Sequence, residues 1–341
     1  MALKISVCMP IFNCADYVEQ ALDSILPQLD ERMEVIVYDG GSTDGTADRI
    51  ASYTNSWPNL RYYRSERRGG IDADMATCVG YARGEYCWLF SGDDVMRPGA
   101  IARVLDWIAL SRDVYICKHT ICSKEMEVFH DHLVLDPDQV FAANLANLEE
   151  RREWFRRAVT TEAFFSFMSG LIVRREKWQN GTLPDAFKGS CWGHVARLFS
   201  LAPTGLTVCY VAEVWLDKRG GNDSFADKGV VNRFRIGIEG YSRLADAYFG
   251  GDSIEARHIR RVLRNEFPLK MLQHTRILCL RHPETEDRKL LDRLAGIAYG
   301  DNSPAVLAKR MIYFAIPDWL FLAAAFVYRA IKNTARALRH G

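Results

Sequence analysis

The sequence predicts an α/β fold in which a mostly parallel sheet is flanked by helices and followed by a helical appendage. Short apolar runs alternate with amphipathic stretches over about the first 110 residues, as in strand–helix units joined by right-handed crossovers. Each apolar run stops at polar residues, which places those residues at the carboxyl edge of a Rossmann-like sheet. From Val231 onward the apolar residues recur at helical spacing instead.

Length and composition exclude several classes of protein. The 341 residues suffice for one large domain or one and a half. Charge is nearly balanced, with 44 basic and 43 acidic residues, which does not favour binding to nucleic acid. Nine scattered cysteines without a C-x-x-C pair predict reduced thiols in the cytoplasm. The first ten residues do not have the layout of a signal peptide.

The first predicted strand, Ile5 to Met9, ends in a loop that contains Pro10, Phe12 and Asn13. Asn13 is a typical N-cap for the amphipathic helix that follows it. The second predicted strand closes in a turn that begins at Asp39. We therefore expect the first two loops to lie side by side at one edge of the sheet.

The turn after the second strand is rich in glycine, hydroxyls and carboxylates, and it includes Gly41 and Ser42. Such a turn lets a ligand approach the backbone closely and has oxygen acceptors for a ribose or a base. The same residue types are also ordinary in turns, so this turn alone does not identify a ligand.

A third strand, Leu60 to Tyr63, leads to Arg67 and Arg68 and then to a helix that contains Asp72. Guanidinium groups match the geometry of phosphate oxygens, so these arginines are candidates for contacting a diphosphate. Most arginines are nevertheless solvated surface residues, and that alternative stays open here.

The fourth strand, Tyr86 to Phe90, is the most informative because it stops at Ser91, Gly92, Asp93 and Asp94. Two adjacent carboxylates at the carboxyl end of a buried strand lie where open α/β sheets bind ligands. Hard oxygen ligands of this kind suit Mg²⁺ or Mn²⁺ together with substrate phosphates. An acidic turn that only caps the next helix is the alternative reading.

These motifs together resemble family 2 nucleotide-sugar glycosyltransferases, which have the GT-A fold. The resemblance rests on the Pro-x-Phe-Asn start, the Asp-Gly-Gly-Ser-Thr-Asp-Gly-Thr turn, and the Ala-Arg-Gly-Glu-Tyr and Ser-Gly-Asp-Asp segments. Gly69 to Asp72, Trp88 to Asp94 and Arg219 to Ser224 most resemble the abequosyltransferase-like branch. The resemblance is clearest over residues 4 to about 110, extends to about 225 and is absent beyond.

The resemblance implies a GT-A domain over residues 1–225. Its first half, 1–110, would bind the nucleotide sugar, and its second half, 111–225, would form the acceptor side. Beyond it, the helical spacing predicts an appendage over 226–305, and the composition predicts a membrane-associating segment over 306–341.

The resemblance also implies roles for single residues. Pro10, Phe12 and Asp39 fall where the family contacts the base and the ribose, and Asp72 falls near the sugar and the diphosphate. Asp93 matches the metal-binding carboxylate of the family, with Asp94 beside it, which implies Mg²⁺ or Mn²⁺ as the cofactor. The remaining residues that we assign to the donor are Asn13, Gly41, Ser42, Arg68, Ser91, Gly92 and Arg219.

The chain departs from the family pattern at three places. Ser91 replaces the first acid of the metal motif, and Gly40 stands where the second acid of an Asp-Asp-Gly-Ser turn is expected. The Glu-Asp pair that usually supplies the catalytic base is missing, and the chain has Gly193-His194 instead.

His194 is therefore our first candidate for the base that accepts the proton of the acceptor hydroxyl, because imidazole titrates near neutral pH. Asp185 is the second candidate. A lone histidine at a helix start is also common as a cap or a packing residue, and this alternative stays open. Trp192 lies beside His194 and is the residue that we expect to contact the acceptor. Arg219 to Ser224 is either a lid over the donor or a surface turn.

The stretch from Met311 to Tyr328 is almost wholly apolar and is interrupted by Pro317 and Asp318. Basic residues recur after it at helical spacing, through residue 339. The run is close to the lower length limit of a membrane span, so we prefer a helix that lies in the interface of an anionic leaflet. A spanning or re-entrant helix and a helix docked on a core or an oligomer partner are the alternatives.

The expected function is transfer of a sugar from a nucleoside diphosphate to a polyprenyl-diphosphate-linked saccharide, with inversion, during synthesis of an O-antigen or capsule. The branch resemblance favours a deoxy- or dideoxyhexose donor. The enzyme would bind peripherally to the cytoplasmic face of the inner membrane through residues 311–339, and a homo-oligomer is compatible with the sequence. A sugar nucleotidyltransferase and a catalytically degenerate scaffold that binds sugar nucleotides are the competing functions.

Overall fold

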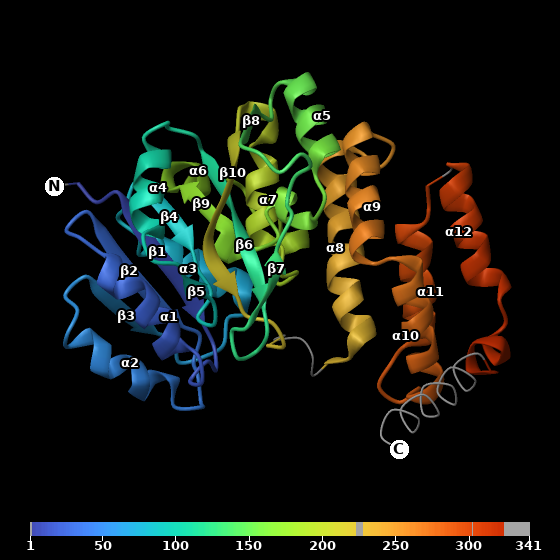
Figure 1. The fold of residues 1–341 in the computed structure, drawn as a ribbon, viewed down its shortest axis with the longest axis horizontal. Helices are drawn as coiled ribbons and strands as arrows, with labels where there is room; N and C mark the ends of the chain where they lie inside the picture. Colours follow the sequence, from blue (N-terminus) through green and yellow to red (C-terminus); the bar gives the residue numbers. More distant parts are fainter. Residues whose placement is uncertain (1, 223–227, 302, 324–341) are drawn as a thin grey trace, which may run out of the picture. The chain divides into compact units, whose positions relative to one another are not determined.

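The computed structural model describes residues 2–222, 228–301 and 303–323, and it divides into two compact units (Figure 1). The first unit comprises Met1–Asn222 and the second Asp223–Gly341. Each unit has its own hydrophobic core, one on the sheet and one between helices. The predicted lid, Arg219 to Ser224, lies partly outside the described residues.

The amino-terminal half of the sheet has the predicted parallel strands, in the order β3-β2-β1-β4. Helices follow the first three of these strands, and α3 packs on β1 and β2. These elements are β1 (Ile5–Ile11), α1 (Val18–Ile25), η1 (Leu26–Gln28), β2 (Met33–Asp39), α2 (Thr46–Thr54), β3 (Leu60–Arg64), α3 (Ile71–Gly80) and β4 (Tyr86–Leu89).

The second half of the sheet is mixed. Strand β9 lies between β4 and β6 and is antiparallel to both, whereas β10 runs parallel to β6. The strands are β5 (Val95–Met96), β6 (Val114–Cys122), β7 (Val128–Asp131), β8 (Phe141–Asn144), β9 (Leu171–Arg174) and β10 (Thr207–Lys218). The helices are α4 (Ala100–Ile108), α5 (Leu148–Arg157), η2 (Thr161–Phe164), η3 (Met168–Gly170), α6 (Arg175–Asn180), η4 (Asp185–Phe187), α7 (Gly193–Ser200) and η5 (Ala202–Thr204). The prediction of a mostly parallel sheet therefore holds for its amino-terminal half only.

The core explains why these segments form strands and helices. Every residue of β1 and of β4 is buried, as expected for central strands whose two faces are both covered. Helix α1 buries Val18, Ala21, Leu22 and Ile25, which recur at the spacing of one helical face. Burial of these apolar side chains is the main favourable contribution to the stability of the unit.

The second unit is helical, as predicted. Its helices are α8 (Val230–Phe249), α9 (Ile254–Glu266), α10 (Leu269–Arg281), α11 (Arg288–Ala298) and α12 (Pro304–Ala315). Helices α9 and α10 are separate because Pro268, between them, disfavours helical geometry at the residue before it and lacks an amide proton. The core of this unit includes Leu272, Leu291 and Leu294.

The predicted apolar segment from Met311 to Tyr328 is described only as far as residue 323. Helix α12 ends at Ala315, before Pro317, and Asp318 accepts hydrogen bonds from Arg276 (2.7 Å) and Arg288 (2.8 Å). Among the described residues, no helix combines the length and the apolar composition needed to cross a bilayer.

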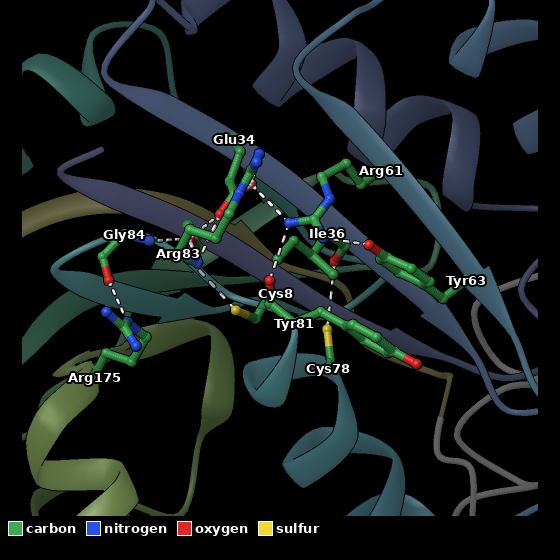
Figure 2. A network of polar contacts seen from close by, with 11 residues as sticks. Cys8, Glu34, Ile36, Arg61, Tyr63, Cys78, Tyr81, Arg83, Gly84 and Arg175 are labelled. Atoms are coloured by element: carbon green, nitrogen blue, oxygen red, sulfur yellow. Dashed lines mark hydrogen bonds and ion pairs between the residues drawn. The ribbon is translucent and has the colours of Figure 1, made fainter. Parts of the chain in front are cut away.

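A buried carboxylate joins the strands at the edge of the sheet opposite the polar loops (Figure 2). Glu34, near the start of β2, accepts hydrogen bonds from Ser6 on β1 (2.7 Å) and from the Arg83 guanidinium (2.7 Å). Arg61 on β3 donates a further one (3.1 Å). Burial raises the pKa of Glu34, but the hydrogen bonds from Arg83 and Ser6 lower it by more, so the net shift is downward. The ionised carboxylate therefore stabilises the folded state.

We expect the substitution Glu34→Gln to lower the free energy of unfolding by about 1–3 kcal/mol at neutral pH, because buried Ser6 and the two arginines lose a charged acceptor. Since the pKa of Glu34 is lower in the folded than in the unfolded chain, its contribution is complete above the unfolded value. It is lost as the pH falls through the folded value. Denaturant unfolding at a series of pH values measures the difference between variant and wild type, which should shrink below about pH 4.

The matched control is Glu31→Gln, which changes an exposed carboxylate three residues away and should leave stability unchanged within about 0.5 kcal/mol. Equal effects of the two substitutions would contradict the structural role of Glu34.

Candidate active site

The loops after β1 and β2 are joined by hydrogen bonds at the carboxyl edge of the sheet. The amide of Asn13 donates to the Ser42 hydroxyl (2.9 Å), and the amide of Thr43 donates to the Asn13 side chain (2.8 Å). Asn13 has a positive φ of 51°, which Asn tolerates better than most residues. The two predicted donor loops thus form one surface, next to the buried end of β1 that contains Pro10.

Asp39 is fully buried at the end of β2 and organises the turn that follows it. One carboxylate oxygen accepts the amides of Gly41 (3.0 Å) and Ser42 (2.7 Å), and the other accepts the Tyr62 hydroxyl (2.8 Å). Arg64 lies 3.6 Å away. A carboxylate has about four acceptor sites, so one remains for a ligand.

The side chains of Phe12 and Arg68 form a pair above this turn, with the guanidinium carbon 4.0 Å from the ring centroid. Phe12 is half-buried and Arg68 is exposed. A flat apolar ring and a planar cation at a loop edge are typical of surfaces that stack on a base.

Asp74 on α3 lies beside Gly40, one of the positions at which the chain departs from the family pattern. A Cβ at position 40 would be 2.5 Å from a carboxylate oxygen of Asp74, so the glycine is needed for this close approach. Burial raises the pKa of Asp74, while hydrogen bonding to the Gly69 amide and the nearby Arg68 lower it. A carboxylate from α3 thus occupies the space of the missing side chain.

Asp93 and Asp94 follow β4, as predicted, but their environments differ. Asp94 is 2 % exposed, and its carboxylate accepts hydrogen bonds from the Ser169 hydroxyl (2.6 Å) and the Arg219 amide (3.0 Å). Burial and the neighbouring Asp93 together raise its pKa to about 7. Asp94 is therefore an anchor of the loop.

Asp93 is only partly buried, and both partners of its carboxylate are neutral: the hydroxyl of Ser91 and the side-chain amide of Asn222 (2.8 Å). Within the part of the chain that the structure describes, no lysine or arginine forms an ion pair with it. An accessible carboxylate held by neutral donors fits a hard divalent cation, which would supply the charge that these donors lack. Gly92, between Ser91 and Asp93, is buried, and a Cβ there would lie 2.8 Å from the side chain of Ile11.

Arg219 supports the same loop from the end of β10. Its side chain donates to the backbone carbonyl of Asp93 (2.8 Å) and to Gln20 (2.5 Å), and it lies over the ring of Tyr17 (4.8 Å). Arg219 is 7 % exposed, and its contacts with the protein position the Asp93 backbone. A direct contact with the donor would require some of them to be exchanged.

Asp72, which the resemblance assigns to the donor, accepts the amides of Cys191 (3.0 Å) and Gly193 (2.9 Å). These amides lie immediately before and at the start of α7, so Asp72 satisfies donors that have no partner within that helix. The contact joins the donor half of the unit to the segment that contains Trp192 and His194.

His194 is buried, at 5 % exposure. Its Nε2 lies 2.9 Å from the carbonyl of Phe165 and donates to it, which leaves the lone pair on Nδ1. Among the described residues, Nδ1 has no hydrogen-bond partner. Burial lowers the pKa of His194, while Asp72 and the Phe165 carbonyl oppose this shift. A neutral imidazole with a free lone pair is the form that a general base requires.

The other two predicted residues on this side differ in exposure. The Asp185 side chain is 91 % exposed and forms an ion pair with Lys188 (2.6 Å), whose hydrogen bond lowers its pKa. A low pKa and full solvation make it a weak base. Trp192 is buried, with its ring 6.1 Å from that of His194.

Comparison with known proteins identifies the family. The model of glycosyl transferase family 2 matches residues 6–173. Abequosyltransferase RfbV of Salmonella typhimurium is 30% identical over 273 residues, which is 78% of this chain and 81% of that protein. The chain belongs to glycosyl transferase family 2. The resemblance to abequosyltransferases noted in the sequence is thereby confirmed.

Other relatives match over a shorter part of the chain. Chondroitin synthase of Pasteurella multocida is 33% identical over 97 residues, which is 28% of this chain and 10% of that protein.

Solved structures confirm that this family 2 chain has the GT-A fold. S. aureus TarS 1-349 in complex with UDP-GlcNAc has a TM-score of 0.61 at 16% identity, covering 91% of this chain and 84% of that one. The mannosyltransferase PcManGT from Pyrobaculum calidifontis, in complex with GDP-Man and Mn²⁺, has a TM-score of 0.52 at 17% identity, covering 96% and 87%. The predicted fold, including the C-terminal helices, is confirmed.

Sequence reasoning missed several residues that complete the site. Tyr62, Asp74 and Ser169 contact or flank Asp39, Gly40 and Asp94 from distant parts of the chain. Gly40 was the one local signal, because a glycine in place of an acid indicates that another group occupies the space.

A second group of titratable residues, which the sequence did not indicate, lies in the same unit. His119 and His132 approach the carboxylate of Glu162 within 3.5 and 3.2 Å. Burial lowers the pKa of His119 to about 2 and that of His132 to about 4, and it raises the pKa of Glu162 to about 7. Both imidazoles are therefore neutral at physiological pH.

Proposed function

We propose that this chain transfers a sugar, with inversion, from a nucleoside-diphosphate donor to a polyprenyl-diphosphate-linked saccharide. The acceptor would be an intermediate of a surface polysaccharide such as an O-antigen or a capsule. The observation that carries the proposal is the joined edge of loops around Asp39 and Asp93 in a chain of family 2. The likeness to abequosyltransferase RfbV supports a deoxy- or dideoxyhexose donor.

In the proposed complex, the nucleoside lies on the β1 and β2 loops. Phe12 and Arg68 are paired at this edge and would stack on the base. The remaining acceptor site of Asp39 suits a ribose hydroxyl. Asp74, in the space next to Gly40, is the carboxylate that would face the base or ribose.

The diphosphate would lie near Asp93. When bound there, Mg²⁺ or Mn²⁺ supplies positive charge that offsets the charge developing on the leaving diphosphate. Ser91 and Asn222 orient the Asp93 carboxylate, and Arg219 fixes its backbone. The contribution of the protein residues is to hold this carboxylate in one position.

In an inverting reaction the acceptor oxygen attacks the anomeric carbon as the bond to the diphosphate breaks. The acceptor hydroxyl loses its proton to a base. His194 is better suited than Asp185 because its Nδ1 has no hydrogen-bond partner among the described residues, whereas Asp185 is solvated and paired with Lys188. Trp192, next to His194, would contact the acceptor sugar.

The membrane-linked acceptor is consistent with the exposed surface of the second unit. Met311 and Trp319 are 63 % and 68 % exposed, and Lys309 and Arg310 precede them as exposed basic residues. Apolar side chains beside basic ones are typical of segments that lie in the interface of an anionic leaflet. We therefore propose peripheral attachment to the cytoplasmic face of the inner membrane.

The donor assignment predicts that one of UDP, GDP, CDP and dTDP stabilises the protein only with Mn²⁺ present. A ligand at a hundredfold excess over its dissociation constant raises stability by about 2.7 kcal/mol. Thermal shift measurements on wild type, Asp93→Asn and the control Asp106→Asn, which changes an exposed carboxylate on α4, test this. Only Asp93→Asn should lose the nucleotide-dependent shift, and a flat response of the wild type would contradict the donor site.

The base assignment predicts that His194→Ala lowers kcat by at least about 100-fold while the donor-induced thermal shift is retained, because general-base catalysis contributes about that much or more. Release of the nucleoside diphosphate in the presence of a lipid-linked acceptor measures turnover. Asp185→Asn is the matched control and should retain full activity. Unchanged turnover of His194→Ala would exclude His194.

A catalytically degenerate scaffold is a competing function, and the burial of His194 is compatible with it. If the wild type binds a nucleotide sugar but does not turn over with any lipid-linked acceptor, the scaffold is the better description. A sugar nucleotidyltransferase would instead join a sugar 1-phosphate to a nucleoside triphosphate and release inorganic pyrophosphate, which an assay with those two substrates detects.

The membrane assignment predicts that the double substitution Met311→Glu and Trp319→Glu weakens binding to phosphatidylglycerol vesicles at least about tenfold, because two apolar side chains can no longer enter the interface. Vesicle flotation measures the bound fraction. Phe129→Glu changes an exposed aromatic residue on β7 of the first unit and is the control. Equal flotation of all three proteins would place the membrane contact elsewhere.

A further inference from the structure

The buried cluster of His119, His132 and Glu162 is separate from the residues assigned to the donor and the acceptor. His119 is on β6, His132 follows β7, and Glu162 is in η2. Their side chains are 0%, 21% and 8% exposed. One potential ligand atom of each residue lies within 4.8 Å of those of the other two. Side chains from three separate segments thus converge on one point.

Two distances in the cluster, each to a different carboxylate oxygen of Glu162, are close to those between ligands of one metal ion. Nitrogen and oxygen ligands lie about 2.0–2.1 Å from tetrahedral Zn²⁺, which places two such ligands roughly 3.3–3.4 Å apart. The carboxylate oxygens of Glu162 lie 3.2 Å from Nε2 of His132 and 3.5 Å from Nε2 of His119.

The polar atoms of the cluster are also unsatisfied. Within the described residues, Nδ1 and Nε2 of His119, Nε2 of His132 and one carboxylate oxygen of Glu162 are buried without a hydrogen-bond partner. Unpaired buried polar atoms are rare in folded proteins and indicate a missing water or ion. An imidazole presents only one of its nitrogens to a given ion, so three ligand atoms, one from each residue, are close enough to share one ligand.

The surroundings hold the two rings in place. The ring of His119 lies 4.7 Å from that of His132 and 4.5 Å from that of Phe167. Lys218 lies 3.5 Å from Glu162 and opposes a cation there, but its side chain is 34% exposed and lies over the Phe167 ring. It has room to turn towards solvent when the carboxylate gains another positive partner.

We propose that His119, His132 and Glu162 bind one divalent transition-metal ion of the Zn²⁺ class, with a fourth position left for water or another ligand. Two imidazoles and a carboxylate suit Zn²⁺ and its neighbours, whereas Mg²⁺ prefers oxygen ligands alone. This site differs in chemistry from the one at Asp93 and does not depend on the proposed transferase activity. The bound ion would join β6, β7 and η2.

Titration of the chelator-stripped full-length protein with Co²⁺, followed by displacement with Zn²⁺, tests the proposal. The ligand-field absorption of Co²⁺ reports its coordination in the visible range. We expect one equivalent to bind with tetrahedral absorption in the wild type and in Asp93→Asn. Thermal unfolding with and without Zn²⁺ provides a second readout, since a ligand of the folded state raises the melting temperature.

The variants His132→Gln and Glu162→Gln should bind the ion at least about 100-fold more weakly. Removing a residue that only hydrogen-bonds to a metal ligand already lowers affinity by up to about 100-fold, and these variants remove a ligand itself. His130→Gln is the matched control, because His130 is exposed on β7 and outside the cluster. It should bind like the wild type. Two ligand variants are used so that a folding defect in one leaves the other informative.

Three results would overturn the proposal. The first is a wild type without a tetrahedral Co²⁺ spectrum. The second is that both ligand variants retain this spectrum. The third is that only Asp93→Asn abolishes it. The last result would assign the ion to the proposed donor site instead.

Discussion

The buried carboxylate of Asp94 is the interaction on which the candidate site depends. It accepts hydrogen bonds from Ser169, just before β9, and from the backbone of Arg219, just after β10. Three segments far apart in sequence therefore meet at one side chain. Burial raises its pKa to about 7 even though these donors favour the ionised form.

The position of Asp93 follows from that anchor. Asp94 faces the interior, so its neighbour faces the loops, and Arg219 fixes the Asp93 carbonyl while contacting Gln20 of α1. The first helix of the sheet and its last strand are thus both tied to the candidate metal ligand. At the opposite edge, the contacts of Glu34 hold β1, β2 and β3 in register. The sheet between these two buried carboxylates is a rigid support for the loops of the candidate site.

Local pattern was sufficient to predict the amino-terminal half of the fold, because its first three strands are each followed directly by a helix. It was insufficient for β9, which pairs with Leu89 and with Ile116 through Leu171, partners separated from it by many residues. The same limit applies to the site. Asp39 and Asp93 follow strands and were predicted from position, whereas Ser169 and the His119 cluster become neighbours only when the sheet is complete.

The departures from the family motif have physical explanations in contacts that the motif itself does not contain. At position 40 the lost acid is balanced by Asp74, whose carboxylate fills the space that only a glycine leaves. At position 91 the acid is replaced by a hydroxyl that donates to Asp93. The first change keeps a negative charge beside the proposed nucleoside, and the second removes one beside the proposed diphosphate. A site with one accessible carboxylate still suits Mg²⁺ or Mn²⁺, because substrate phosphates commonly complete the coordination of such ions. In the proposed reaction the ion would therefore bind more tightly with the donor than without it.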